Sequence, residues 1–254
     1  MTKKDKKGQV AIFVIIAVVL VASILLFLFI ENGSKIQSSF EENPPAYISD
    51  CVQRPLEDIE LKIISSNGYL NANSTNFIIY EGEKVPYLCK ASKFYTSCVN
   101  QDPLIIERIR SEIESYTYSK TESCFDSLTL GLENKGYEVS QGVLSTQVEF
   151  NQDSIVLNID KSYNVEKEGT SNFKKFKAEA KSPLFKLFSL AQTIVNFESQ
   201  YCEFDNILWM RVYRDIKIER FRASEQTKIY TLTDRVSEKS IKFAVKTCVL
   251  PAGI

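Results

Sequence analysis

VAIFVIIAVVLVASILLFLFI, residues 10–30, is the stretch around which the whole chain is organised. Its 21 residues include no charged residue, no proline and no glycine, and only one serine. At about 1.5 Å per residue, a helix of this length extends about 31 Å, which matches the hydrocarbon core of a bilayer. Because a helix satisfies its own backbone hydrogen bonds, it can cross lipid without help from water. The stretch therefore predicts a transmembrane helix that contacts membrane lipid through residues 10–30.

The charges on either side of this stretch indicate its orientation. Residues 1–9 carry four lysines and one aspartate, whereas residues 31–45 carry three glutamates and one lysine. Because an excess of lysine and arginine stays in the cytoplasm, we expect a cytoplasmic N-terminus and an extracytoplasmic C-terminal domain at the cell membrane. A cleaved secretory signal is the alternative, but its apolar region spans about 7–15 residues and ends in a small-x-small site, which this stretch lacks. The predicted parts are a basic leader (1–9), a transmembrane helix (10–30), a polar linker (31–45) and an extracytoplasmic domain (46–254) with a sub-boundary near residue 140.

Lys6-Lys7-Gly8-Gln9, directly before the apolar stretch, resembles the leader of archaeal prepilins, the class III signal peptides. The resemblance implies cleavage between Gly8 and Gln9, with the hydrophobic helix left on the mature protein. The chain departs from the pilin pattern at Phe13, where many pilins carry Glu, and at Asn32-Gly33 and Pro44-Pro45, which interrupt the helix. The alternative is that Gly8-Gln9 is an ordinary link between the basic leader and a plain signal anchor.

All the cysteines lie C-terminal to the apolar stretch: Cys51, Cys89, Cys98, Cys124, Cys202 and Cys248. An even number of cysteines in an extracytoplasmic domain predicts disulfides, and buried free thiols are the alternative. A metal site is not indicated, because the chain has no CxxC pair and no histidine. The sequons at Asn32 and Asn73 are compatible with glycosylation outside the cell.

Six cysteines allow 15 connectivities, which we rank by loop length and by elimination. Cys89–Cys98 comes first, because the loop between them is short and polar and lies between Pro86 and Pro103. Cys51–Cys124 comes second, because the pattern predicts that each cysteine opens a similar helical unit. Cys202–Cys248 is the remaining pair.

Composition excludes several classes of function. The formal net charge is −1, so the chain lacks the basic footprint of a nucleic-acid-binding protein. The absence of histidine removes the commonest general base and the commonest metal ligand. The sequence contains no glycine-rich phosphate loop, no GxSxG and no HExxH motif, so we name no catalytic, cofactor or metal residue. We expect the carboxylates that cluster near a helix end (Glu198, Glu203 and Asp205) to form a solvated face.

Periodicity predicts an α+β fold with several helices and an antiparallel β-sheet. The clearest signals are the apolar helical face of Ile48, Val52, Leu56, Ile59 and Ile63 and the alternating hairpin around residues 151–154. The remaining predictions are helices at 46–66, after Asp102-Pro103, from Cys124 to Gly136 and from Ser182-Pro183 to Tyr201, and strands at 77–80, 173–180, 212–218, 228–233 and 241–249.

The layout also resembles a family of uncharacterised archaeal membrane-anchored proteins. The matching features are the Lys-Gly-Gln leader, two units that run from a cysteine to Gly-Tyr, the helix after Ser182-Pro183, and IYTLTDRVSEKSIKFAVKT at residues 229–247. The resemblance implies a surface protein and supplies no activity.

These observations favour a structural or interaction protein, a single-pass surface subunit of pilin-like type that binds other surface proteins or its own copies. An anchored receptor for a glycan or peptide is the second hypothesis, and a histidine-free enzyme that uses carboxylates is the third. An open sheet edge or an exposed apolar patch would favour the first hypothesis. A deep pocket with paired carboxylates of raised pKa would favour the third.

Overall fold

The computed structural model describes residues 19–21, 23, 43–70, 76–224 and 226–248. The principal elements are α2 (Pro44–Ser65), β1 (Phe77–Tyr80), β2 (Glu83–Lys90), β3 (Val99–Asn100), α3 (Ile105–Glu133), β4 (Glu138–Gln141), β5 (Ser145–Phe150), β6 (Ser154–Glu166), β7 (Thr170–Lys181), α4 (Leu184–Tyr201), α5 (Asn206–Val212), β8 (Ile216–Arg222), β9 (Thr227–Asp234) and β10 (Ser240–Lys246). The predicted α+β class is confirmed. Of the predicted transmembrane segment, only residues 19–21 and 23 fall in the described part. Among the described residues, no helix is both long enough and apolar enough to cross a bilayer.

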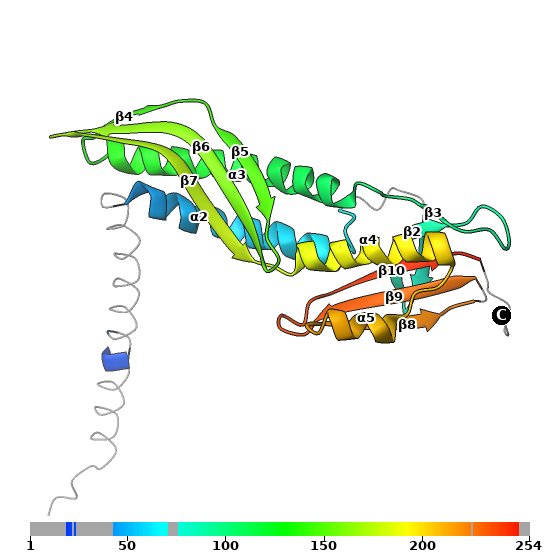
Figure 1. Ribbon diagram of the computed structural model, residues 1–254. Coiled ribbons are helices and arrows are strands. Elements are labelled where there is room, and N and C mark those ends of the chain that lie inside the picture. Colours follow the sequence, from blue (N-terminus) through cyan, green and yellow to red (C-terminus); the bar gives the residue numbers. More distant parts are fainter. Residues whose placement is uncertain (1–18, 22, 24–42, 71–75, 225, 249–254) are drawn as a thin grey trace, which may run out of the picture.

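Two sheets lie at opposite ends of an elongated molecule (Figure 1). Strands β4 to β7 lie alongside α2 and α3 at one end, and β1, β2 and β8 to β10 lie beside α4 and α5 at the other. One cluster of buried side chains runs through both ends, from Ile48 of α2 to Val245 of β10. The two sheets therefore share a hydrophobic core.

In the first sheet β6 is the shared strand: β5 pairs with its residues 155–160, β4 with its residues 163–166, and β7 with residues 154–166. All three pairs are antiparallel. The predicted hairpin is confirmed, with Phe150 opposite Ile155 and Thr146 opposite Ile159. The predicted apolar face of α2 is also confirmed, since all five of its residues are buried. Helix α2 begins at Pro44, two residues earlier than predicted, because Asn43 accepts a hydrogen bond from the amide of Ala46 and caps the helix.

Helix α3 corrects the prediction of two helices between residues 103 and 136. It is one helix of 29 residues, whose polar middle continues without a break. Thr117 and Thr121 are buried, and they donate their hydroxyls to the carbonyls four residues earlier, at 2.8 Å in both cases, so no unsatisfied hydroxyl interrupts the helix here. Asp102 does not cap the helix, whose N-cap is Leu104.

The second sheet has the order β1-β2-β10-β9-β8 and is mixed, because β2 and β10 run parallel. The prediction of a purely antiparallel sheet is therefore wrong for this pair, which joins segments from the two ends of the domain. The strand predicted at 212–218 is also wrong in its first half, since Val212 ends α5 and β8 begins at Ile216. Tyr201, predicted on the inner face of α4, is 61% exposed.

All six cysteines form disulfides: Cys51–Cys124, Cys89–Cys98 and Cys202–Cys248, with Cα–Cα distances of 6.0, 5.3 and 5.5 Å. These are the three pairings ranked above. One of the reasons was wrong, however, because neither Cys51 nor Cys124 opens a helix. Both lie within helices, and their disulfide links α2 to α3.

Candidate functional site

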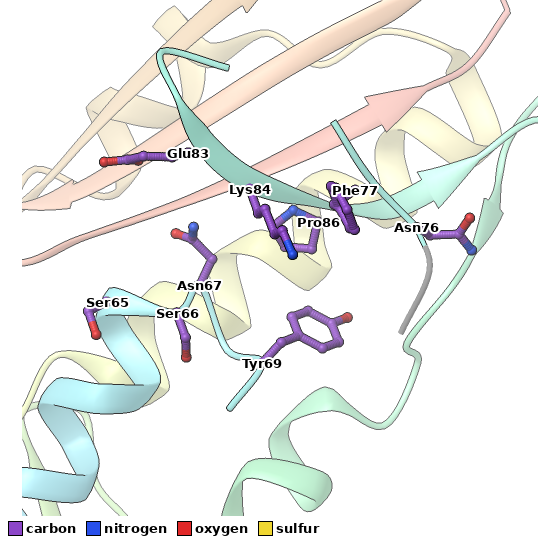
Figure 2. Close-up of a pocket in the computed structure, with 9 residues that line it drawn as sticks. All are labelled: Ser65, Ser66, Asn67, Tyr69, Asn76, Phe77, Glu83, Lys84 and Pro86. Carbon is purple, nitrogen blue, oxygen red and sulfur yellow. The ribbon is translucent and has the colours of Figure 1, made fainter. Parts of the chain in front are cut away.

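A cleft of about 330 Å³ lies between the end of α2 and the β1–β2 hairpin (Figure 2). The end of α2 contributes Ser65, Ser66, Asn67 and Tyr69, and the hairpin region contributes Asn76, Phe77, Glu83, Lys84 and Pro86. In Figure 2 the ring of Tyr69 lies on one side of the cleft, while Lys84, Pro86 and Phe77 lie on the other. The cleft thus combines two aromatic rings with amide, hydroxyl and ammonium groups.

The backbone after α2 turns sharply and brings Tyr69 into the cleft. Asn67 and Gly68 have φ angles of 53° and 88°, and the amide of Gly68 donates to the carbonyl of Ile63 at 2.8 Å. A Cβ atom at position 68 would lie 2.7 Å from Cε1 of Phe188 in α4. Both the left-handed φ angle and the contact with Phe188 require glycine here.

A polar network fixes the orientation of Tyr69. Its hydroxyl donates to Oδ2 of Asp102 at 3.0 Å, and the guanidinium of Arg108 lies 4.4 Å from the centre of its ring. Arg108 also donates to Asp102 at 2.8 Å and to the carbonyl of Gly68 at 2.9 Å, so it ties α3 to the turn after α2. Burial, followed by the negative charge of Asp102, raises the pKa of Tyr69 above its usual range. The phenol therefore stays neutral and presents a fixed ring to the cleft.

Lys84 is the charged group of the cleft that forms no ion pair with the described residues. Within the described part of the chain its ammonium contacts the ring of Phe77, 4.7 Å from the centroid, and no carboxylate pairs with it. The other charge, Glu83, is compensated by Lys242 at 2.8 Å. The two serine hydroxyls donate to the carbonyl of Lys62, so they offer their lone pairs to a ligand. This arrangement suits recognition of a polar or acidic group beside an apolar surface.

The acidic cluster near the end of α4 corrects the prediction of a solvated face. Glu198 is completely buried and pairs with Lys228 of β9, whose Nζ lies 2.9 Å from Oε2 of Glu198 and 2.9 Å from Oε2 of Glu203. The hydroxyl of Tyr230 donates to Glu198 as well. Asp205 caps α5 by accepting from two amides. The cluster therefore fastens α4 to the second sheet.

A second ionic cluster surrounds Lys186 of α4. Its ammonium lies 2.6 Å from Asp234, 2.7 Å from Asp153 and 3.0 Å from Asp215. Burial by itself would raise the pKa of Asp234, but hydrogen bonds from Lys186 and Ser237 outweigh it and lower the pKa. The pKa of Glu203 is lowered in the same way, against the effect of burial, by Lys228 and Arg220. These shifts are opposite to the raised pKa that a carboxylic general acid requires.

The other residues singled out from sequence lie elsewhere. The leader residues Gly8 and Gln9 and the sequon residues Asn32 and Asn73 fall outside the described residues, so cleavage and glycosylation stay predictions. None of the six cysteines lines the cleft. Sequence reasoning did not bring Tyr69, Lys84 and Arg108 together around one site, because they come from three separate segments of the chain.

Comparison with protein-family models, with curated proteins and with solved structures gave no match. The resemblance to archaeal membrane-anchored proteins therefore stays a prediction that rests on the motifs quoted above.

Proposed function

We propose that the chain is a single-pass, membrane-anchored cell-surface protein whose disulfide-stabilised domain acts by binding rather than by catalysis. In this proposal residues 10–30 hold the protein in the membrane with the N-terminus inside. The domain outside is a structural or interaction subunit of pilin-like type that contacts other surface proteins or further copies of itself.

The observation that carries this proposal is the pairing of all six cysteines, downstream of an uncharged stretch of 21 residues. Disulfides persist in oxidising compartments and are rare in the cytosol, so they support the orientation that the flanking charges predict. Apolar side chains that are more than half exposed, such as Ile79, Phe94 and Ile207, support binding to other macromolecules.

The cleft supports a second candidate, an anchored receptor for a glycan or a peptide. Tyr69 and Phe77 offer ring surfaces to an apolar face of a ligand, and Asn67 and Lys84 offer polar groups beside them. A sugar or an extended peptide with an acidic group has this combination of surfaces. The third hypothesis, a carboxylate enzyme, receives no support from the lowered pKa values of Glu203 and Asp234.

Protease added to intact cells is expected to remove the domain that follows Glu31. An epitope tag after Ile254 reports the loss on a reducing gel, because an extracytoplasmic domain is accessible without lysis. A cytoplasmic marker protein that stays intact is the control for cell integrity. If the tagged chain survives in intact cells and is digested only after lysis, the proposed orientation is wrong.

A further inference from the structure

Among the strands of the described residues, β1 pairs only with β2 and so forms an edge of the second sheet. The carbonyl of Asn76 accepts the amide of Tyr87 at 2.8 Å, so residue 76 faces β2. Because the direction of backbone groups alternates along a strand, residues 78 and 80 face β2 as well. The N–H and C=O groups of Phe77 and Ile79 therefore point away from the sheet, where a further strand would bind.

Three other edge strands, β8, β5 and β7, carry protection that β1 lacks. Strand β8 presents four charged side chains: Lys217, Glu219, Arg220 and Arg222. On β5, the amide of Val148 donates to Glu114 of α3 at 2.8 Å, and β7 carries four lysines and packs against α2. Charged residues, bulges and covering helices are the usual ways in which proteins prevent strand pairing at an edge. The sequence of β1, FIIY, has no charge and no proline, and its register with β2 is unbroken.

The side chains of β1 are apolar on both faces of the sheet. Phe77 and Ile79, which are 38% and 59% exposed, share the face of the cleft. Ile78 and Tyr80 lie on the opposite face, where they pack on a small buried cluster that includes Val85. An exposed, uncharged edge of this kind favours pairing with another strand of matching character.

We propose that β1 pairs with β1 of a second copy of the chain, antiparallel, about a two-fold axis at Ile78. In this register Phe77 of each copy lies opposite Ile79 of the other, and their outward groups form four backbone hydrogen bonds. Each Phe–Ile pair is a favourable cross-strand contact, and no charges of like sign face each other in the strands. The interface is self-complementary, as a two-fold dimer requires.

Charges beside the strand are complementary in the same arrangement. Lys84 lies opposite Ile79 in β2, and its ammonium reaches over the ring of Phe77, 4.7 Å from the centroid. The two-fold axis brings the turn of one copy, with Glu81, toward this ring and ammonium of the other copy. Glu81 is exposed, and its carboxylate lies 3.7 Å from the ammonium of Lys242, which is closer to Glu83 at 2.8 Å. A pair between Lys84 and Glu81 of the second copy would form twice per dimer, which selects a second copy as the occupant of this edge.

Disulfide trapping in membranes tests this register. Residue 78 faces itself across the axis in a non-hydrogen-bonded pair, with Cα atoms about 4.5 Å apart, within the range of a disulfide. Because the native cysteines are all paired, Ile78→Cys adds one free thiol to the full chain. Mild oxidation should give a dimer band at twice 29.0 kDa on a non-reducing gel. Val143→Cys, an exposed position outside β1, measures random collisions and should give about tenfold less dimer.

A proline substitution in β1, compared with one outside the strand, provides the matched control. Ile79→Pro removes the outward amide without removing a hydrogen bond to β2, so Ile78→Cys/Ile79→Pro should lose the dimer and keep its melting temperature. Ile78→Cys/Val143→Pro should keep the dimer. A dimer yield for Ile78→Cys no higher than for Val143→Cys, or a dimer that persists with Ile79→Pro, overturns the proposal. The inference rests on the proposed interaction function, but its failure would leave the protease result unaffected, so the two fail separately.

Discussion

Replacing Lys228 with methionine is expected to lower the free energy of unfolding by about 3–5 kcal/mol, the usual cost of removing one partner of a buried ion pair. Lys228 is 3% exposed and Glu198 is completely buried, so the substitution leaves a carboxylate without its cation inside the protein. The lost ammonium also donates to the carbonyl of Cys202 at 2.7 Å. Urea unfolding followed by the fluorescence of Trp209, the single tryptophan, measures the change.

Lys217→Met is the matched control for this substitution. Lys217 lies on β8 and pairs with Glu219 at 2.8 Å, but both side chains are about half exposed. Water screens such a pair, so its loss is expected to cost less than about 1 kcal/mol. Equal costs for the two variants would mean that the Glu198–Lys228 pair does not fasten α4 to the sheet. The double variant Glu198→Leu/Lys228→Met should recover part of the loss, because no unpaired charge remains.

Removing the Cys51–Cys124 disulfide is expected to cost about 4 kcal/mol, and removing Cys89–Cys98 about 2.5 kcal/mol, in the chain-entropy model. The difference follows from the sequence separations, which are 73 and 9 residues. The first disulfide restrains the unfolded chain over a long loop and joins α2 to α3, whereas the second closes only the loop between β2 and β3. Thermal and urea unfolding of the two double-alanine variants compare these costs directly.

The order of the two effects is the informative result. Both variants replace two cysteines by alanine in largely buried surroundings, so the packing losses partly cancel in the comparison. If the Cys89/Cys98 variant is the less stable of the two, the loop that the Cys89–Cys98 disulfide closes contributes more to the free energy of unfolding than the link between α2 and α3 does. That outcome would contradict the role assigned here to Cys51–Cys124.

Local patterns predicted those parts of the fold that depend on neighbouring residues. The alternation on either side of residues 151–154 specified a hairpin, and the spacing from Ile48 to Ile63 specified a helical face. The parallel pairing of β2 with β10 joins distant segments, so no periodicity could indicate it. The burial of Glu198 was missed because its cation, Lys228, is supplied by a strand 30 residues further along the chain.

The cleft illustrates the same limit for function. Gly68 could be recognised as the end of a helix, but its contact with Phe188 and the position of Arg108 over Tyr69 arise only from tertiary packing. For strand β1 the situation is the opposite, because its sequence is the informative part. Its uncharged sequence FIIY can be read without a structure, but only the sheet shows that no other described strand pairs with its outer side.

The redox state of the six cysteines in producing cells tests the central claim, an oxidised domain on the outer side of the membrane. Cells are quenched in acid, the proteins are denatured, free thiols are blocked, and disulfides are then reduced and labelled with a maleimide–polyethylene glycol. We expect six labels per chain on the gel, since Cys51, Cys89, Cys98, Cys124, Cys202 and Cys248 are all paired. A chain that carries no label would have held free thiols in a reducing compartment, and it would contradict the anchored, extracytoplasmic assignment.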